Sequence, residues 1–305
     1  MERSWSAVPV LMALVMSPFL FSVINRTKAI FGGRRGQPLL QPYADIAKLL
    51  RKGAVYSRTT TRVFRIGPVA GLASVLAALA LTPLGPSGAL VSFEGDVVLF
   101  VYLFAVMRFV TVLAALDTGS AFEGMGASRE VQFSALGEVA FFLGITALAA
   151  LTHRTSLSGI LDALGNSPEV HGGGPVHFLV GSALFVVLLA ENARLPVDDP
   201  ETHLELTMIH EVMVLDHGGV DLGLIQYAGC LKLWVMASLL AGVVLPAGSV
   251  HTVASAAILP AGILALAVLI GVVESTMARL RLVMVPQLLV AAGVLALLAL
   301  IVVPG

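Results

Sequence analysis

Charge and cysteine are both scarce in this 305-residue chain. Only 12% of its residues are charged, against about a quarter in soluble domains, while 57% are hydrophobic and the mean hydropathy is +0.94. The single cysteine, Cys230, excludes an internal disulfide and falls short of the four thiolates that hold an iron–sulfur cluster. We therefore expect a chain that lies in a bilayer and carries no redox centre of its own.

Long apolar runs without alternation predict an all-α fold. Lipid offers no partner for backbone amides, so helices are the simplest way for such runs to cross it. Eight runs have the roughly 20 residues that a crossing needs: residues 4–23, 66–84, 97–116, 131–151, 176–191, 225–245, 253–273 and 285–303. The first could pass for a secretory signal, but its weakly basic flank and the later runs favour a helix. We expect one transmembrane domain, residues 1–305.

Basic residues gather in one predicted loop, residues 24–65. It holds ten Lys and Arg against a single acid, Asp45, and the positive-inside rule places such a loop in the cytoplasm. Eight spans then put both termini outside the cell membrane. The acidic loop 192–224 falls on the cytoplasmic side, and the predicted outer loops 85–96 and 246–252 contain no Lys or Arg.

Five ionisable residues lie inside or at the ends of predicted spans: Arg108, Glu138, Glu191, Lys232 and Glu274. A charge within hydrocarbon costs several kcal/mol, so each one is a candidate for function. All five fall in the cytoplasmic half, which predicts a half-channel that leaves sideways into a partner subunit. Arg108 and Lys232 could instead be anchors that reach the membrane surface, and Glu191 and Glu274 could simply be solvated.

The densest group of ionisable residues is in the segment 191–211. Asp199 followed by Pro200 is typical of a helix start, which would place Glu201 and Glu205 one turn apart on one face. Two carboxyls at that spacing repel and titrate as a coupled pair that can hold and pass a proton. The alternative is a solvated acidic helix.

Three histidines, His203, His210 and His217, recur every seven residues and would share a face if the helix persisted. Positions seven apart on a helix are about 10 Å from each other, too far to bind one metal at about 2 Å. The pair His210-Glu211 also lacks the second histidine of a zinc protease motif. We expect no metal site.

Four segments, in order, carry a family resemblance. The segment 191–211 resembles the glutamate-rich loop between the fifth and sixth helices of the complex I (NADH-quinone oxidoreductase) membrane subunit that lies next to the peripheral arm. The segment 35–49 is similar to that family's first cytoplasmic loop. The segments 117–130 and 274–282 are more similar to the membrane subunit of formate hydrogenlyase and related energy-converting nickel–iron hydrogenases.

The resemblance implies a subunit that docks a peripheral hydrogenase-like arm and receives its energy. Nickel–iron and iron–sulfur centres would lie in partners: large and small hydrogenase-like subunits and an iron–sulfur protein. Antiporter-like membrane subunits would continue a proton or sodium path, and no nucleic acid is involved. Carried over by position, the chamber and ion path would use Glu138, Glu191, Arg194, Asp198, Glu201, Glu205 and Lys232. The docking seat would use Arg35, Asp45, Lys48, Asp117, Arg129, Glu130, Glu274, Arg279 and Arg281.

Two departures from the family pattern bear on the substrate. His203 stands where relatives commonly carry another acid, and the Tyr-Ser-Gly that follows the loop glutamates in complex I is absent. The second departure weighs against a quinone headgroup site and favours the hydrogenase branch. A quinone-chamber subunit of the complex I kind and a purely structural membrane anchor remain alternatives. A free-standing transporter is disfavoured, because inverted repeats and broken helices at mid-membrane are not apparent.

Overall fold

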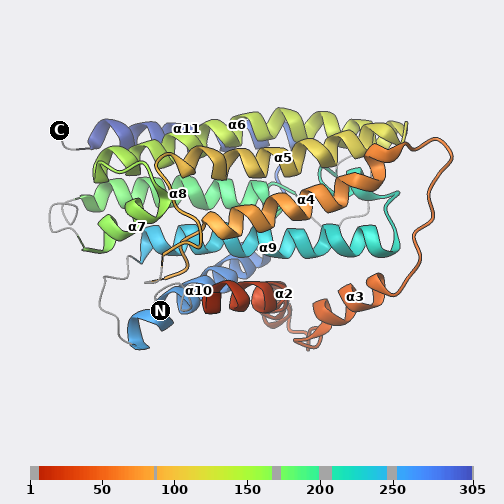
Figure 1. Ribbon diagram of the computed structural model, residues 1–305, viewed down its shortest axis with the longest axis horizontal. Helices are drawn as coiled ribbons and strands as arrows, with labels where there is room; N and C mark the ends of the chain where they lie inside the picture. The colour runs from red at the N-terminus through yellow and green to blue at the C-terminus, as the bar shows by residue number, and fades with distance from the viewer. Residues whose placement is uncertain (1–6, 86–87, 167–172, 199–207, 246–252, 304–305) are drawn as a thin grey trace.

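The computed structural model describes residues 7–85, 88–166, 173–198, 208–245 and 253–303. Within them the chain is all-α without strands, and eight helices are long and apolar enough to cross a membrane, which confirms the predicted fold class and number of spans (Figure 1). These helices are α2 (Ala7–Phe31), α4 (Arg62–Leu81), α5 (Asp96–Asp117), α6 (Ala121–Thr152), α8 (Gly174–Glu191), α9 (Gly219–Val244), α10 (Val253–Thr276) and α11 (Val285–Val302).

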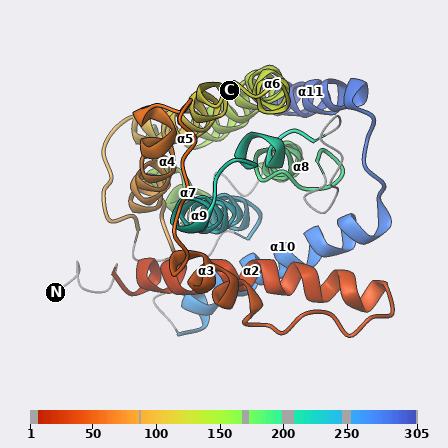
Figure 2. The same ribbon diagram turned by 90° about the vertical axis from the view of Figure 1, so that its right-hand side faces the viewer.

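The centre of the bundle is α9. Seen along the bundle in Figure 2, α9 and α8 lie inside, α4, α5, α6 and α11 cover one side, and α2 and α10 cover the other. In α9, 78% of the most apolar stretch is buried, against 28–44% in the other spans. The helix is apolar around its whole circumference, as a helix surrounded by protein must be. Leu231, Trp234, Val235 and Leu239 are among its core residues.

Helices α2 and α10 are steeply inclined to the other spans. Figures 1 and 2 together show that α2 runs across the bundle more than along it and packs on α10. A Cβ added to Gly271 would lie 2.6 Å from the Cβ of Thr27 and 3.0 Å from the carbonyl oxygen of Ile24. The glycine is therefore what permits this close crossing, because any side chain would force the helices apart.

Four shorter elements were not expected from the sequence. They are the helices α3 (Gln41–Leu50) and α7 (Leu157–Asn166) and the 3-10 helices η2 (Glu211–Val214) and η3 (Leu282–Met284). Helix α2 also continues to Phe31, and α6 begins at Ala121, ten residues before the predicted start. The start of the predicted basic loop is thus helical, and Arg129 and Glu130 lie on a helix.

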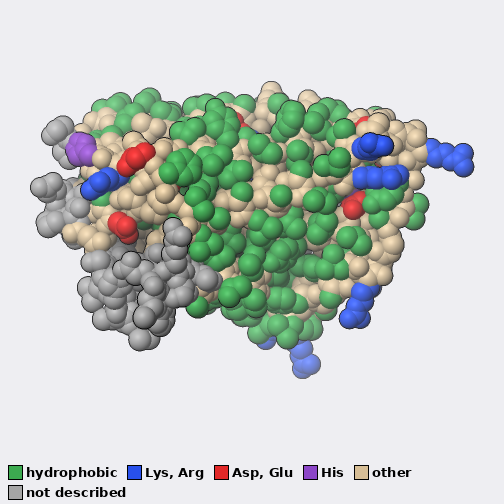
Figure 3. Space-filling view, viewed as in Figure 1, with side chains coloured by type: hydrophobic (Ala, Val, Ile, Leu, Met, Phe, Trp, Pro, Cys, Tyr) green, Lys and Arg blue, Asp and Glu red, His purple; other side chains and the backbone are tan. Residues whose placement is uncertain are grey.

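The two ends of the bundle differ in charge. We call the end that holds α3, η2, η3 and the α5–α6 turn the charged end, and the opposite one the far end. On the face shown in Figure 3, hydrophobic side chains cover the middle and most Lys and Arg side chains lie toward the charged end. The α2–α4, α8–α9 and α10–α11 connections, which carry about half of the predicted site residues, are at this end.

Candidate functional site

The guanidinium of Arg108 is the centre of a buried cluster that joins α5, α6, α8 and α9. Its two terminal nitrogens contact Oε1 of Glu138 at 2.6 Å and Oε1 of Glu191 at 2.9 Å, and its Nε lies 3.7 Å from Oε1 of Glu130. Lys232 Nζ lies 2.7 Å from Oε2 of Glu191 and donates a 2.6 Å hydrogen bond to the same residue's carbonyl oxygen. We call these five residues the Arg108 cluster.

Neither cation of the Arg108 cluster is exposed at the surface of the protein. The side chains of Arg108 and Lys232 are 8% and 7% exposed, and each is held by carboxylate. The alternative that they are surface anchors is therefore wrong, as is the alternative that Glu191, with a side chain 9% exposed, is solvated. Sequence reasoning singled out Arg108 but left it off the ion path, although the structure places it against three acids.

A second buried cluster involves Glu274 near the end of α10. Its side chain is fully buried, with Oε1 at 3.3 Å from a terminal nitrogen of Arg194 and Oε2 at 3.2 Å from Nζ of Lys28. The Arg194 guanidinium also stacks over the ring of Phe21, 4.2 Å from its centroid. The solvated alternative is thus wrong for Glu274 too. The residue ties α10, α2 and the α8–α9 connection together at the charged end.

Asp198 organises the α8–α9 connection. Its Oδ1 accepts a 2.8 Å hydrogen bond from Arg279, and its Oδ2 accepts hydrogen bonds from the backbone amides of Ile209 and His210 at 3.2 and 3.0 Å. One carboxylate therefore holds the two sides of this connection and the α10–α11 connection in place. The predicted pair Glu201 and Glu205, and His203, lie outside the described residues.

Other residues of the predicted docking seat have distinct positions. Asp117 accepts hydrogen bonds from the amides of Thr61 and Phe64 at 2.6 and 3.3 Å, so it caps the start of α4. Arg129 donates a 2.9 Å hydrogen bond to the carbonyl oxygen of Met208 and so fixes the end of the α8–α9 connection onto α6. The remaining seat residues are exposed at the charged end: Arg35, Asp45, Lys48 and Arg281.

A chamber of about 660 Å³ lies between α2, α3, the end of α8, η2 and α9. Glu191, Arg194 and Lys232 line one side of it, and Asp45 and Lys48 of α3 line another. This volume is within the range of small-molecule sites. Sequence reasoning missed the wall formed by α3, because this ten-residue helix lies within the segment 24–65, which its charge predicts to be a loop.

The three histidines do not share a helical face as far as the structure describes them. His210 precedes η2, which ends at Val214, and His217 follows it in a turn. Among the described residues no group of three or more His, Cys, Asp or Glu side chains could hold a metal ion. The face predicted for a persisting helix is therefore wrong between residues 210 and 217.

His217 instead packs as a flat aromatic side chain. Its imidazole stacks on Phe64, with ring centroids 3.9 Å apart and planes at 8°, and Tyr56 contacts the same phenyl ring edge-on. Burial lowers the pKa of His217, although Asp221 and Asp216 act in the opposite direction. This residue was seen in the sequence only as part of a periodic pattern, which gave no sign of the stack.

Taken together, the fold and these contacts define a multi-pass membrane protein with ionisable side chains buried beside a chamber at one end. The model of the NADH dehydrogenase family matches residues 5–304, and the chain belongs to that family.

Two curated relatives are similar over most of their length. The chain is 30% identical to formate hydrogenlyase subunit 4 of Escherichia coli (strain K12), covering 92% of each protein. It is 31% identical to hydrogenase-4 component C of the same organism, covering 88% of this chain and 85% of the relative. It is also 26% identical to the H component of NADH-quinone oxidoreductase from Polaromonas sp., over 71% of this chain and 62% of that protein.

A solved structure shares the fold. A chain in the structure of the membrane-bound sulfane sulfur reductase, an archaeal respiratory membrane complex, superposes with a TM-score of 0.81 at 22% identity, covering 96% of this chain and 98% of that one. The predicted family and its two branches are thus confirmed by the comparisons.

Proposed function

We propose that this chain is the ion-coupling membrane subunit of a redox complex of the formate hydrogenlyase or energy-converting hydrogenase type. It docks a peripheral nickel–iron hydrogenase-like arm at the charged end and passes the arm's energy to a proton or sodium path. The observation that carries the proposal is the Arg108 cluster, because ionisable residues buried within spans are expensive and are kept for transport or catalysis. Similarity to formate hydrogenlyase subunit 4 supports the choice of complex.

The charge balance of the Arg108 cluster suits ion transfer. Three carboxylates, of Glu130, Glu138 and Glu191, face two cations, Arg108 and Lys232, which leaves one negative charge without a partner. An uncompensated buried charge is costly, so the cluster favours the arrival of one further positive charge. The three acids share one guanidinium. When a cation binds to one of these acids, that acid interacts less strongly with Arg108, and the interaction of Arg108 with the other two acids changes as well.

The route out of the cluster points to a membrane partner. The side chain of Glu138 is 34% exposed, whereas those of Arg108 and Glu191 are below 10%. Glu138 is therefore the acid through which an ion would leave sideways, toward an antiporter-like subunit. As the family resemblance implies, Arg194, Asp198, Glu201 and Glu205 take part where the ion enters, and the large and small hydrogenase-like subunits and an iron–sulfur protein bind at the charged end.

The test uses the intact complex in sealed membrane vesicles. Glu138→Gln keeps the size of the side chain and removes its charge, so electron transfer by the arm should continue while ion translocation per electron falls. Glu201→Gln and Glu205→Gln should act in the same way. Glu94→Gln, exposed at the far end, is the matched control and should change neither quantity. Normal translocation per electron in both Glu138→Gln and Glu201→Gln would leave the purely structural anchor as the function.

Orientation is part of the proposal. We place the charged end in the cytoplasm and the start of α2 and the end of α11 on the outer side of the cell membrane, since Lys and Arg concentrate at the charged end. Ser57→Cys and Thr155→Cys introduce exposed thiols at the two ends, and Cys230 is buried and leaves little background. An impermeant maleimide added outside intact cells should label only Thr155→Cys. Labelling of Ser57→Cys alone would show that the orientation is the opposite of the one proposed.

A second candidate function is a quinone chamber of the complex I kind. The volume of the chamber favours it, because about 660 Å³ can hold a headgroup and part of an isoprenoid tail. A photoreactive short-chain quinone should then label α3 or η2, and unlabelled quinone should compete. If the quinone labelled neither α3 nor η2, the hydrogenase-type function, which needs no quinone, would stand alone.

A further inference from the structure

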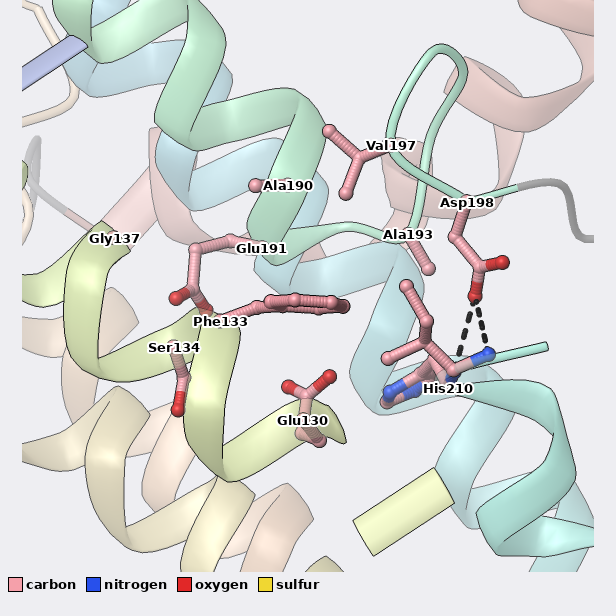
Figure 4. A pocket seen from close by; sticks show the side chains of 11 residues that line it. Glu130, Phe133, Ser134, Gly137, Ala190, Glu191, Ala193, Val197, Asp198 and His210 are labelled. Atoms are coloured by element: carbon pink, nitrogen blue, oxygen red, sulfur yellow. Dashed lines mark hydrogen bonds between the residues drawn. The ribbon is translucent and has the colours of Figure 1, made fainter. Parts of the chain in front are cut away.

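His210 lies where three cavities meet, one of them a space of about 10 Å³ between α4, α5 and α9. It lines the chamber of about 660 Å³, and it also lines a second cavity of about 20 Å³ between α6, the end of α8 and the α8–α9 connection. The small cavity is bordered by Glu130, Glu191 and Asp198 (Figure 4). Figure 4 shows the imidazole of His210 pointing from the connection toward the side on which Glu130 lies. The Arg108 cluster thus borders the small cavity through Glu130 and Glu191.

The space between His210 and the cluster is of the right size for water. A site of about 10–15 Å³ holds one water molecule when polar groups surround it. The small cavity has room for one or two waters and is lined by carboxylates, the Ser134 hydroxyl and an imidazole. A proton that reaches His210 therefore needs only a short hydrogen-bonded step to arrive at Glu130.

Two acids near His210, Glu191 and Asp198, are poorly suited to take up the proton first. Both oxygens of Glu191 are in ion pairs, one with Arg108 and one with Lys232. The oxygens of Asp198 are bound by Arg279 and two backbone amides. Each is stabilised as an anion and would surrender a partner on taking a proton. Imidazole, in contrast, exchanges protons near neutral pH and has two nitrogens that can face different cavities.

We propose that His210 is the relay through which protons pass from the chamber to the Arg108 cluster. One ring nitrogen takes a proton from the chamber, and the other releases a proton to water in the small cavity, from which it reaches Glu130. The imidazole returns to its starting tautomer by rotation or by further exchange, so no net charge remains on it. The inference rests on the proposed function and deepens it, because it names the ion as a proton and the residue at which it enters.

Several charged groups border the same cavities and will shape the pH dependence of this step. They are Asp45 and Lys48 of α3, Lys52 just after it, Glu130 of α6, Glu191 at the end of α8, Arg194, Asp198, His210, Glu211 and His217 of the α8–α9 connection, and Lys232 of α9. Only His210 and His217 among them are histidines, and His217 is stacked on Phe64 away from the small cavity's lining. Chemical rescue at position 210 is therefore more telling than a pH profile alone.

The experiment replaces His210 in the complete complex in sealed vesicles. Gln and Asn are used in parallel, because each reproduces the hydrogen bond of one ring nitrogen without the proton exchange. Electron transfer to the natural acceptor should continue, while the number of protons moved per electron should fall about tenfold or more. His177→Gln is the matched control, since His177 lies in α8 and its Nδ1 is 2.7 Å from the carbonyl oxygen of Gly173 at the far end. It should behave as the native chain.

Added imidazole should restore proton movement to the His210→Gln complex, and pyrazole, of similar shape but much weaker basicity, should not. The relay is overturned if either variant moves protons normally, if electron transfer and proton movement fall equally, if pyrazole rescues as well as imidazole, or if neither variant assembles. A native complex that moves sodium instead also overturns it. A native complex that translocates no ion at all would overturn the proposed function itself, which keeps the two failures apart.

Discussion

The two halves of the bundle bury ionisable groups for different reasons. In the charged half, Asp198 binds backbone amides, but the side chains of Arg108, Glu191 and Lys232 come from three spans and pair mainly with one another. In the far half, Asp96 is fully buried, but its carboxylate accepts hydrogen bonds from the amides of Leu157 and Phe93 and so closes a helix start and a turn. Burial alone therefore does not mark a functional acid; the partners of the buried group do.

The comparison predicts that the largest loss follows from Arg108→Met. The change removes the cation that faces three acids and leaves buried Glu191 with Lys232 as its remaining cation, which should lower the free energy of unfolding by about 3–5 kcal/mol. Thermal unfolding of the purified chain in detergent measures it. Arg154→Met, exposed at the far end, should be neutral. If both variants unfolded at the same temperature as the native chain, the ion pairs of the charged half would not stabilise the bundle.

A backbone contact should give the next largest effect. A Cβ at Gly126 would lie 2.2 Å from Cγ1 of Val212 and 2.9 Å from the carbonyl oxygen of Ile209. Gly126→Ala should therefore push η2 away from α6 and lower the free energy of unfolding by about 1–3 kcal/mol. Gly124 is on the same helix with open space around it, so Gly124→Ala should be neutral or slightly stabilising. Proteolysis of the α8–α9 connection should rise only in Gly126→Ala. Equal rates would show that η2 is not positioned by α6.

At the far end, Asp96→Asn should cost about 1 kcal/mol through weaker hydrogen bonds to the two amides. Ion translocation per electron should not change, because this acid has a structural role. Asp45→Asn, exposed on α3, is the control for stability and should leave unfolding unaltered. A translocation defect in Asp96→Asn would remove the distinction between the two halves.

The smallest effect is a pH dependence from His217. Burial lowers its pKa in the folded state, so below about pH 6.5 the unfolded chain binds protons that the folded chain does not. Its contribution to stability is complete above the unfolded pKa and is lost as pH falls toward and through the lower folded pKa. The slope is at most about 1.4 kcal/mol per pH unit.

The matching variant is His217→Phe, which keeps the stack on Phe64 without a titratable group. Its melting temperature should change less between pH 7.5 and pH 5.5 than that of the native chain. Identical pH slopes would mean that other groups at the charged end set the dependence.

What the sequence predicted well is local. The eight spans follow from runs of apolar residues, and the intramembrane charges stand out because each is expensive on its own helix. Their pairing is not local: Glu191 and Lys232 are 41 positions apart, and Arg194 and Glu274 are 80 apart. Charge and spacing indicated that partners exist, but only the packing of α8 and α9 and the crossing of α2 and α10 decide which ones. Helix α3 was missed because its ten residues lie within a basic segment that was interpreted as a loop.

The central position of α9 has a consequence for how the protein is made. A span whose residues are mostly buried against protein gains little from lipid, and the lysine within it opposes entry into the bilayer by about 2.5–3.5 kcal/mol. The carboxylate that pairs with Lys232 belongs to Glu191, which leaves the ribosome 41 residues earlier. The cation can thus enter the membrane beside a counter-charge already in place. We therefore expect insertion of α9 to depend on the earlier insertion of α8, which carries this counter-charge.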